Sequence, residues 1–427
     1  MTAAALPAQD AATPLSSVAY GLACVLVLVL QFGPAIGLLG YRLTGAIEWT
    51  LIGALRDATA LALVAVAAAS LPTTGLGVVR APARWALVMV VAFALSAWWT
   101  SHNPFIVALS LRRLVLVPLL FVALLVIPWT RAQLEGLFKL LVTTSMVVAG
   151  VGIVGYLVPD AVWIDLIRIE DYTAASGFDP FGRQGFYESG RYFSHDLVRW
   201  IDQPLRRMLS TYLEPTTLAA GMAAALLLVM ARCARGHSAP WTAGLFVVCG
   251  VLTLSKGFVL FLVVLGAWRL LGFPSPRHVL AAAALAVLVG LWALAAGYTD
   301  GAFAHLDGIG SGLSQVLNGH LLGAGVGGAG NYAASSGAGA ESGLGNTLGQ
   351  VGILALLPLL WIQSIGRAVD EEAARRGEPG GPWIAAWALF WTLTFVFSES
   401  SQGVGGNAIG FMACALYLHR AAGADAT

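Results

Sequence analysis

The sequence predicts an all-α polytopic membrane protein. Of its 427 residues, 58% are hydrophobic and only 11% are charged, whereas soluble domains carry about 25% charged residues. Apolar runs long enough to approach the width of a bilayer recur from one end of the chain to the other. A helix satisfies every backbone hydrogen bond within one such run, so helices are expected throughout. The net charge of +1 shows no basic excess and argues against nucleic acid as a partner.

About 12 apolar runs are candidate transmembrane helices, and several are short enough to require tilt or an interfacial position. They cover residues 18–39, 48–70, 84–99, 106–127, 137–158, 209–231, 240–254, 257–272, 278–298, 343–366, 382–398 and 402–420. The stretch before the first run lacks the basic segment of a cleaved signal peptide, so that run is expected to remain as a span.

These runs divide the chain into five parts. We expect N-terminal membrane helices in 1–158, a long loop in 159–208, central membrane helices in 209–298, a Gly-rich loop in 299–342 and C-terminal membrane helices in 343–427.

Basic residues in the short connections predict the orientation. With a cytoplasmic N-terminus, the short outer loops hold only Arg42 and Lys256. The cytoplasmic connections hold Arg80, Arg84, Arg131, Arg232, Arg235, Arg277, Arg367, Arg375, Arg376 and Arg420. Both long loops then face the outer compartment, and both termini are cytoplasmic.

The two outer loops differ in composition. The first, 159–208, holds six arginines beside eight carboxylates, which favours an anionic ligand over a merely solvated surface. The second, 299–342, is rich in Gly, Ala and Ser and reads either as a flexible linker or as backbone that closes over a site.

Few charges fall within the apolar runs, which makes each of them informative. Arg56 and Asp57 are neighbours in the second run and either neutralise each other or have separate partners. Arg112 and Arg113 are neighbours in the fourth, and adjacent helical positions point about 100° apart. At most one of these two arginines is therefore expected to face a given site, and snorkelling to the headgroups is the alternative.

Cofactor and metal chemistry are not expected. Cys24, Cys233, Cys249 and Cys414 show no CxxC spacing and no accompanying His cluster. The chain also lacks a P-loop and a dinucleotide-binding Gly motif.

Three segments with charged residues are expected to meet at the outer membrane boundary. The first, 206–217, reads RRMLSTYLEPTT and leads into the sixth run. The second is the turn Thr253-Leu-Ser255-Lys256-Gly257, and the third is the Gly-rich loop that ends at Glu341. Together they place guanidinium, ammonium and carboxylate groups at one membrane depth.

These segments resemble the O-antigen ligase and polymerase superfamily, the WaaL- and Wzy-type bacterial enzymes of the GT-C class. That family has an Arg eight residues before the Pro of an Asn/Asp-Pro-Asn element, and Arg207 precedes Glu214-Pro215-Thr216 at that spacing. Its Ser-Arg turn is matched by Ser255-Lys256. Its Gly-rich stretch and His-Asn pair are matched by 323–327 and Glu341-Ser342, with Gly352 eleven residues after Glu341.

The chain departs from the family pattern at three places. Lys256 keeps the positive charge of the family's Arg without its bidentate geometry. Glu-Pro-Thr-Thr replaces the Asn-rich element after Arg207, and Glu341-Ser342 stands where ligases carry His-Asn. The last departure favours a polymerase of exopolysaccharide or capsule type over a ligase.

The resemblance implies a bacterial inner-membrane enzyme whose active site faces the periplasm. Its substrates would be an undecaprenyl-pyrophosphate-linked glycan and the hydroxyl of a second lipid-linked glycan, and its partners membrane lipids and flippase, chain-length or export proteins. Cations would stabilise the leaving pyrophosphate, and a base would take the acceptor proton. Arg207 and Lys256 are the first choices as pyrophosphate ligands. Glu341 is the expected base, with a helix-capping role as its alternative. The remaining candidates are Arg206, Arg191, Arg113, Arg112 and His320 for substrate binding and His195 for catalysis.

Two other classes of protein compete with this interpretation. A ligase would use the same donor and transfer the glycan to lipid A-core or to protein. A lipid-linked glycan transporter would carry its charges along a midplane path and show internal repeats, whereas here the charges gather at one boundary and no repeat between the halves is visible.

Overall fold

The computed structural model describes residues 12–45, 49–74, 81–100, 102–169, 187–188, 191–194, 202–270, 300–329 and 342–423. About 82% of the residues that the structure describes are helical, which confirms the all-α membrane class. Seven helical stretches in the described ranges are long and apolar enough to cross a membrane: Pro14–Thr44, Leu51–Leu71, Ala81–Trp98, Pro104–Val126, Arg131–Leu157, Pro215–Ala234 and Gly343–Arg376.

The N-terminal part is a set of five long helices followed by a short one. They are α1 (Pro14–Thr44), α2 (Trp49–Thr74), α3 (Ala81–Trp98), α4 (Pro104–Val126), α5 (Arg131–Leu157) and α6 (Asp160–Ile167). Hydroxyl and amide side chains begin three of these helices, because Thr13, Asn103 and Thr130 each accept a hydrogen bond from a backbone N–H of the first turn.

Helices α1 and α5 run side by side in the same direction. Near their starts, Gln133 Nε2 donates to Ser16 O at 3.2 Å. Further along, Gln31 Nε2 donates to Thr144 Oγ1 at 2.6 Å. These contacts of side-chain amides with a backbone carbonyl and a hydroxyl fix the register of the two helices.

The first long loop contributes a small antiparallel sheet, which an all-α expectation did not include. It consists of β1 (Tyr187–Glu188), β2 (Arg191–Ser194) and β3 (Leu205–Arg207), in that order. The chain continues through η2 (Ser210–Tyr212), α9 (Pro215–Ala234), α10 (Pro240–Leu252) and α11 (Lys256–Leu270).

The C-terminal part supplies much of the core, to which α1, α4, α5 and α9 also contribute. Its elements are α13 (Asp300–Leu317), α14 (Gly343–Val351), η3 (Gly352–Ala355), α15 (Leu356–Arg376), α16 (Gly381–Phe397), η4 (Glu399–Gln402) and α17 (Gly405–Gly423). Helix α16 is apolar on every side and buried along its length, as expected of an interior helix. Its Trp387 ring meets Phe411 of α17 edge-on at 5.8 Å, and Phe411 in turn stacks on Trp361 of α15 at 4.7 Å.

Several expected spans look different in the structure. The runs at 240–254, 257–272 and 382–398 form helices of 13, 15 and 17 residues, shorter than the roughly 20 residues of a straight span. The run at 343–366 is broken, because Gly352 ends α14 with φ 59°. The run at 278–298 lies outside the described residues, so the number twelve stays a prediction.

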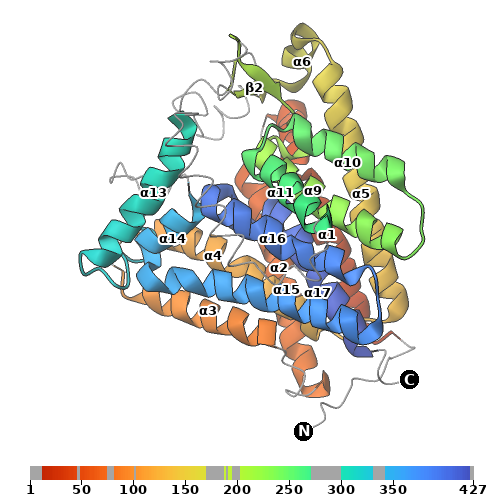
Figure 1. The fold of residues 1–427 in the computed structure, drawn as a ribbon, viewed down its shortest axis with the longest axis vertical. Coiled ribbons are helices and arrows are strands. Elements are labelled where there is room, and N and C mark those ends of the chain that lie inside the picture. The colour runs from red at the N-terminus through yellow and green to blue at the C-terminus, as the bar shows by residue number, and fades with distance from the viewer. Residues whose placement is uncertain are drawn as a thin grey trace.

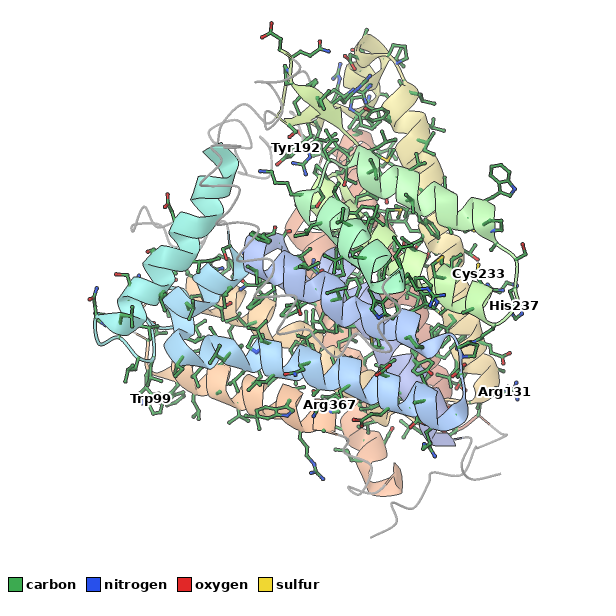
Figure 2. The ribbon with its side chains drawn as sticks, in the orientation of Figure 1. Trp99, Arg131, Tyr192, Cys233, His237 and Arg367 are labelled. Atoms are coloured by element: carbon green, nitrogen blue, oxygen red, sulfur yellow. The ribbon has the colours of Figure 1, made fainter. Side chains whose placement is uncertain are left out.

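The two ends of the bundle differ in what they carry (Figure 1). The β-strands and α6 lie at one end, and α5 begins, at Arg131, near the opposite end. Tyr192 of β2 is accordingly far from Arg131, Cys233 and His237 (Figure 2). The ion pair between Arg235 and Glu378 joins two connections that the sequence places on the cytoplasmic side.

Candidate functional site

Arg207 joins two of the three segments that the sequence singled out. Its Nε donates to the carbonyl oxygen of Thr253 at 2.7 Å. The next residue repeats the contact, since Met208 N donates to Leu252 O at 2.9 Å. The end of β3 is therefore fastened to the turn that carries Ser255 and Lys256, and the guanidinium also lies 5.1 Å from the ring of Tyr192.

The segment after Arg207 is inserted into the helix bundle. Ser210 Oγ donates to Val148 O of α5, and Thr211 Oγ1 donates to Gln31 O of α1, both at 2.6 Å. Gln31 and Val148 each lie seventeen residues into their helix, or about 25 Å along its axis at 1.5 Å per residue. The bilayer core is about 30 Å thick. The segment thus reaches the bundle near the boundary opposite the helix starts.

Strained backbone surrounds this segment. Non-glycine residues with left-handed φ values include Ser210 (54°), Leu213 (53°) and Leu254 (50°). Leu213 directly precedes Glu214, and Leu254 directly precedes Ser255. Such conformations cost about 1 kcal/mol or more each and concentrate at functional sites. Their positions on both sides of the Arg207 contact indicate a site whose geometry is held under strain.

Glu214 is the acid of this cluster. It stands just before α9 and accepts hydrogen bonds from the hydroxyls of Thr216 and Thr217. Burial raises the pKa of the Glu214 carboxyl, while the hydrogen bond from Thr217 and the positive charges of Arg207 and Arg113 oppose that rise. The side chain nevertheless retains some accessible surface.

The adjacent arginines of α4 take different directions, as the helical geometry predicts. Arg112 Nη1 forms an ion pair with Asp57 Oδ2 of α2 at 2.9 Å. Arg113 instead acts electrostatically on Glu214. Arg113 therefore belongs to the cluster, whereas Arg112 is held by its ion pair with Asp57 of the neighbouring helix α2.

The third segment approaches the same part of the molecule from α14. Ser342 Oγ donates to Val396 O in the last turn of α16 at 2.5 Å. A Cβ added to Gly257 would lie 2.8 Å from Thr394 Cγ2 of that same turn. The residue after Lys256 and the residue after Glu341 thus both contact the end of α16.

The two expected catalytic residues, Glu341 and His195, lie outside the described residues. Their flanking residues are informative for Glu341 only. The cap of α14 is Ser342, whose Oγ accepts from Gly345 N at 3.0 Å, so the N-cap position belongs to the serine rather than to Glu341.

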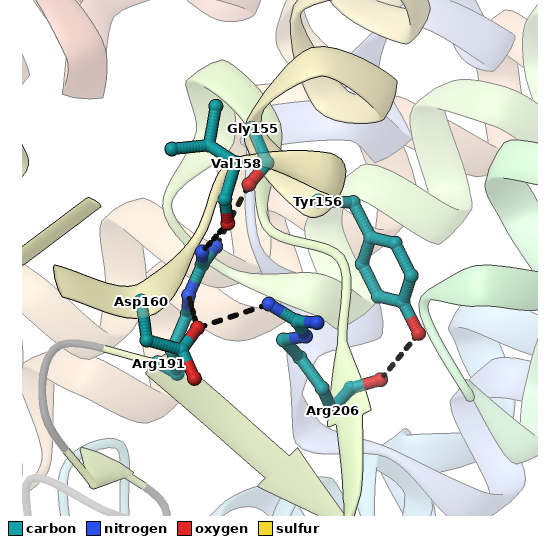
Figure 3. A network of polar contacts seen from close by, with 6 residues as sticks. All are labelled: Gly155, Tyr156, Val158, Asp160, Arg191 and Arg206. Carbon is teal, nitrogen blue, oxygen red and sulfur yellow. Dashed lines mark hydrogen bonds and ion pairs between the residues drawn. The ribbon is translucent and has the colours of Figure 1, made fainter. Parts of the chain in front are cut away.

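Arg191 and Arg206 are engaged elsewhere (Figure 3). Arg191 is buried, pairs with Asp160 at 2.9 Å and donates to the carbonyls of Gly155 and Val158. Arg206 pairs with the same carboxylate at 3.0 Å. Its guanidinium also lies 5.0 Å from the Tyr156 ring. These arginines fasten the sheet to the end of α5, and their expected role as pyrophosphate ligands stays a prediction.

His320 also lies apart from the cluster. The residue after it, Leu321, accepts a hydrogen bond from Ile353 N at 2.9 Å, next to Gly352. Ser342 is at the other end of α14, which is nine residues long, or about 13 Å. His320 itself is exposed at the end of α13.

The described part of the Gly-rich loop is packed rather than loosely tethered. Ala324 N and Gly325 N donate to Gly349 O and Gln350 O, and Gly327 N donates to Gln350 Oε1. Gly325 and Gly327 both have φ of 90°, a conformation that favours glycine. The flexible-linker interpretation does not hold for this part of the loop.

Glu214 is the residue that sequence reasoning missed. In the sequence it belongs to the Glu-Pro-Thr-Thr element that replaces the Asn-rich element of the resembled family. The signal was an acid within the apolar run 209–231, where a charge is costly unless it has a role. No group of three or more His, Cys, Asp or Glu side chains in the described ranges is arranged to hold a metal ion.

Comparison with protein-family models, with curated proteins and with solved structures finds no match for this chain. The chemistry of the site therefore follows from its own residues. Arg113 and Arg207 act electrostatically on one partly buried acid, and the turn that Arg207 contacts carries a third cation, Lys256. With Glu214 ionised these four side chains carry a net charge of +2, which suits a doubly charged anion.

Proposed function

We propose that the protein is a glycosyltransferase that polymerises a polysaccharide at the periplasmic face of a bacterial inner membrane. It transfers a glycan from polyprenyl pyrophosphate to the hydroxyl of an acceptor lipid-linked repeat unit. The observation that carries this proposal is the contact of Arg207 with the Thr253–Lys256 turn, beside Arg113 and Glu214. A pyrophosphate diester carries two negative charges, the complement of this cluster.

The proposed reaction makes one bond and breaks one. The acceptor oxygen forms a bond to the anomeric carbon of the donor while the bond from that carbon to the pyrophosphate oxygen breaks. Polyprenyl pyrophosphate leaves with the bonding electron pair, and fixed guanidinium groups stabilise the charge that develops on it. The acceptor's proton passes to a carboxylate base.

The two acids of the region take different roles in this proposal. Glu214 accepts hydrogen bonds from Thr216 and Thr217 and acts electrostatically with Arg207 and Arg113, so it orders the cations. Glu341 acts as the base. Its support is the position of Ser342 against the last turn of α16, where the residue after Lys256 also lies.

Arg207→Gln tests the pyrophosphate site, with Arg206→Gln as its matched control. The two residues are adjacent in β3, but only Arg207 contacts the Thr253 turn, while Arg206 pairs with Asp160. We expect Arg207→Gln to lower the rate of polymer formation by about 10²- to 10³-fold and Arg206→Gln to retain most of it. The measurement is polymer formed from lipid-linked repeat units by purified protein. Equal activity of the two variants would contradict the assignment.

Glu341→Gln tests the base. Glutamine keeps the shape of the side chain and loses its basicity, so we expect donor binding to persist while turnover falls by about 10²- to 10⁴-fold. The measurement separates KM for the donor from kcat. Wild-type polymer output at normal expression would remove Glu341 from the mechanism.

A further inference from the structure

A second charged cluster lies between α2 and α4, and the proposed transfer reaction does not use it. Arg56 Nε and Arg112 Nη1 both contact the carboxylate of Asp57, each at 2.9 Å. Two guanidinium groups share one carboxylate, so the cluster carries a net charge of +1. Arg112 Nε is buried and has no hydrogen-bond acceptor in the part of the chain that the structure describes.

The cluster lies on the outer flank of the helix bundle. Only 22% of the apolar window of α2 is buried, against 56% for α4 and 72% for α9. Among the described elements, α2 makes its main contacts with α1 and α4, so the rest of its surface faces outward. The side chains of Arg56, Asp57 and Arg112 are 22%, 18% and 31% exposed there.

The cluster lies about two helical turns below the end of the bundle at which α2 and α4 begin. Asp57 and Arg112 each lie eight residues after the start of their helix, or about 12 Å along its axis. Long arginine side chains at this depth reach the phosphate layer by snorkelling. An excess cation on a membrane-facing flank is costly unless an anion neutralises it.

We propose that Arg56 and Arg112 bind the phosphate of a membrane lipid headgroup, which competes with the Asp57 carboxylate for the two guanidinium groups. The site takes a phosphate-bearing lipid, either a polyprenyl phosphate or an anionic phospholipid. Arg113, the next residue of α4, acts on Glu214 inside the candidate functional site. A lipid phosphate on Arg112 is therefore one residue along α4 from that site. Binding at this flank stands independently of glycan transfer.

Lipid affinity of the full-length protein tests the proposal. All proteins compared carry Arg207→Gln, so that the candidate functional site contributes less to binding. Native mass spectrometry in detergent would measure the affinities for polyprenyl monophosphate, phosphatidylglycerol and the neutral lipid phosphatidylcholine. We expect both phosphate-bearing anionic lipids to bind more tightly than phosphatidylcholine, and Arg112→Gln to weaken their binding by about tenfold or more. Tighter binding of the polyprenyl lipid would identify it as the occupant, and tighter binding of phosphatidylglycerol would identify an anionic phospholipid.

Two further variants keep the test decisive. Arg367→Gln is the matched control, because Arg367 is an exposed arginine of α15 whose side chain is 65% accessible. It should leave the affinities unchanged. Asp57→Asn removes the competing negative charge and keeps a side chain of nearly the same size, so it should retain or tighten anion binding. Unchanged affinity in both Arg112→Gln and Arg56→Gln would overturn the site, as would weaker anion binding in Asp57→Asn.

Discussion

Adjacent arginines in this protein serve different purposes, and the difference is set by single contacts. Arg206 pairs with Asp160, whereas Arg207 donates to Thr253 O. Arg112 pairs with Asp57, whereas Arg113 acts on Glu214. In a strand neighbouring side chains point to opposite faces, and in a helix they diverge by about 100°. In each pair one arginine therefore belongs to the candidate site. The other forms an ion pair elsewhere, Arg206 beside the sheet and Arg112 on the outer flank of the bundle.

Glu214 yields a prediction at the same scale. Burial raises the pKa of its carboxyl, so the neutral form is more favoured in the folded protein than in the unfolded chain. The stabilisation from that neutral form is complete below the unfolded-state pKa and is lost as the pH rises through the higher folded-state pKa. Glu214→Gln stays neutral at every pH. We expect its melting temperature in detergent to exceed that of the wild type at about pH 8, with a difference that vanishes as the pH falls toward about 4.

Glu371→Gln is the control for that measurement, because Glu371 is an exposed partner of Arg367 on α15. Exposed ion pairs contribute little to stability, so its melting temperature should follow the wild type at both pH values. A Glu214→Gln protein that melts below the wild type at the higher pH would show that the ionised carboxylate is net stabilising.

At the scale of elements, the break between α14 and α15 positions the third segment of the site. If one helix continued from Gly343 into α15, Ser342 would lie on the axis of α15. Instead the chain turns at Gly352, which has φ 59° and ψ −134°. The Gly-rich loop covers this break, since Ile353 N donates to Leu321 O at 2.9 Å. Interrupted membrane helices are tolerated where protein covers the freed backbone groups.

Gly352→Ala tests how much this break matters. The new Cβ would collide with the carbonyl of Leu321, and the backbone conformation itself disfavours alanine. We expect a loss of stability of about 3 kcal/mol or more, the sum of strain and collision. Gly377→Ala is the matched control, because Gly377 has φ 62° with open space around it, so it should cost only about 1 kcal/mol. Equal melting temperatures of the two variants would show that the loop yields without cost.

At the scale of the molecule, the candidate site depends on segments that the bundle brings together from distant parts of the chain. Arg113 comes from α4, Arg207 from β3, Glu214 from the start of α9 and Lys256 from the start of α11. The inserted segment between β3 and α9 is anchored on Gln31 of α1 and Val148 of α5. Both anchors lie at the same distance along parallel helices, so the bundle sets the depth of the site.

Loss of the whole protein distinguishes polymerase from ligase within the proposed function. A polymerase consumes single lipid-linked repeat units, whereas a ligase consumes the finished polymer on its lipid. We expect cells without the protein to accumulate single repeat units, as measured by mass spectrometry of extracted lipid-linked glycans. Full-length polymer accumulating on the lipid would instead support a ligase. Re-expression of Arg207→Gln should leave the accumulation in place, and Arg206→Gln should relieve it.

The membrane class, the helical content and most of the long spans follow from the sequence by itself. Hydropathy is a sum over contiguous residues, so it needs no knowledge of the fold. The same reasoning indicated that Arg207 and the Lys256 turn lie near one another, because each adjoins the outer end of a predicted apolar run. It also predicted that Arg112 and Arg113 would diverge, since helical geometry is local.

Only the tertiary structure decided which charged side chains belong together. Arg191 and Arg206 were drawn away by Asp160, a residue at the start of α6 that no local pattern links to them. Glu214 became part of the cluster because the inserted segment places it among Arg207, Arg113 and two threonines. The partner of a charge is selected by contacts between residues far apart in the chain, and those contacts exist only once the helices have packed.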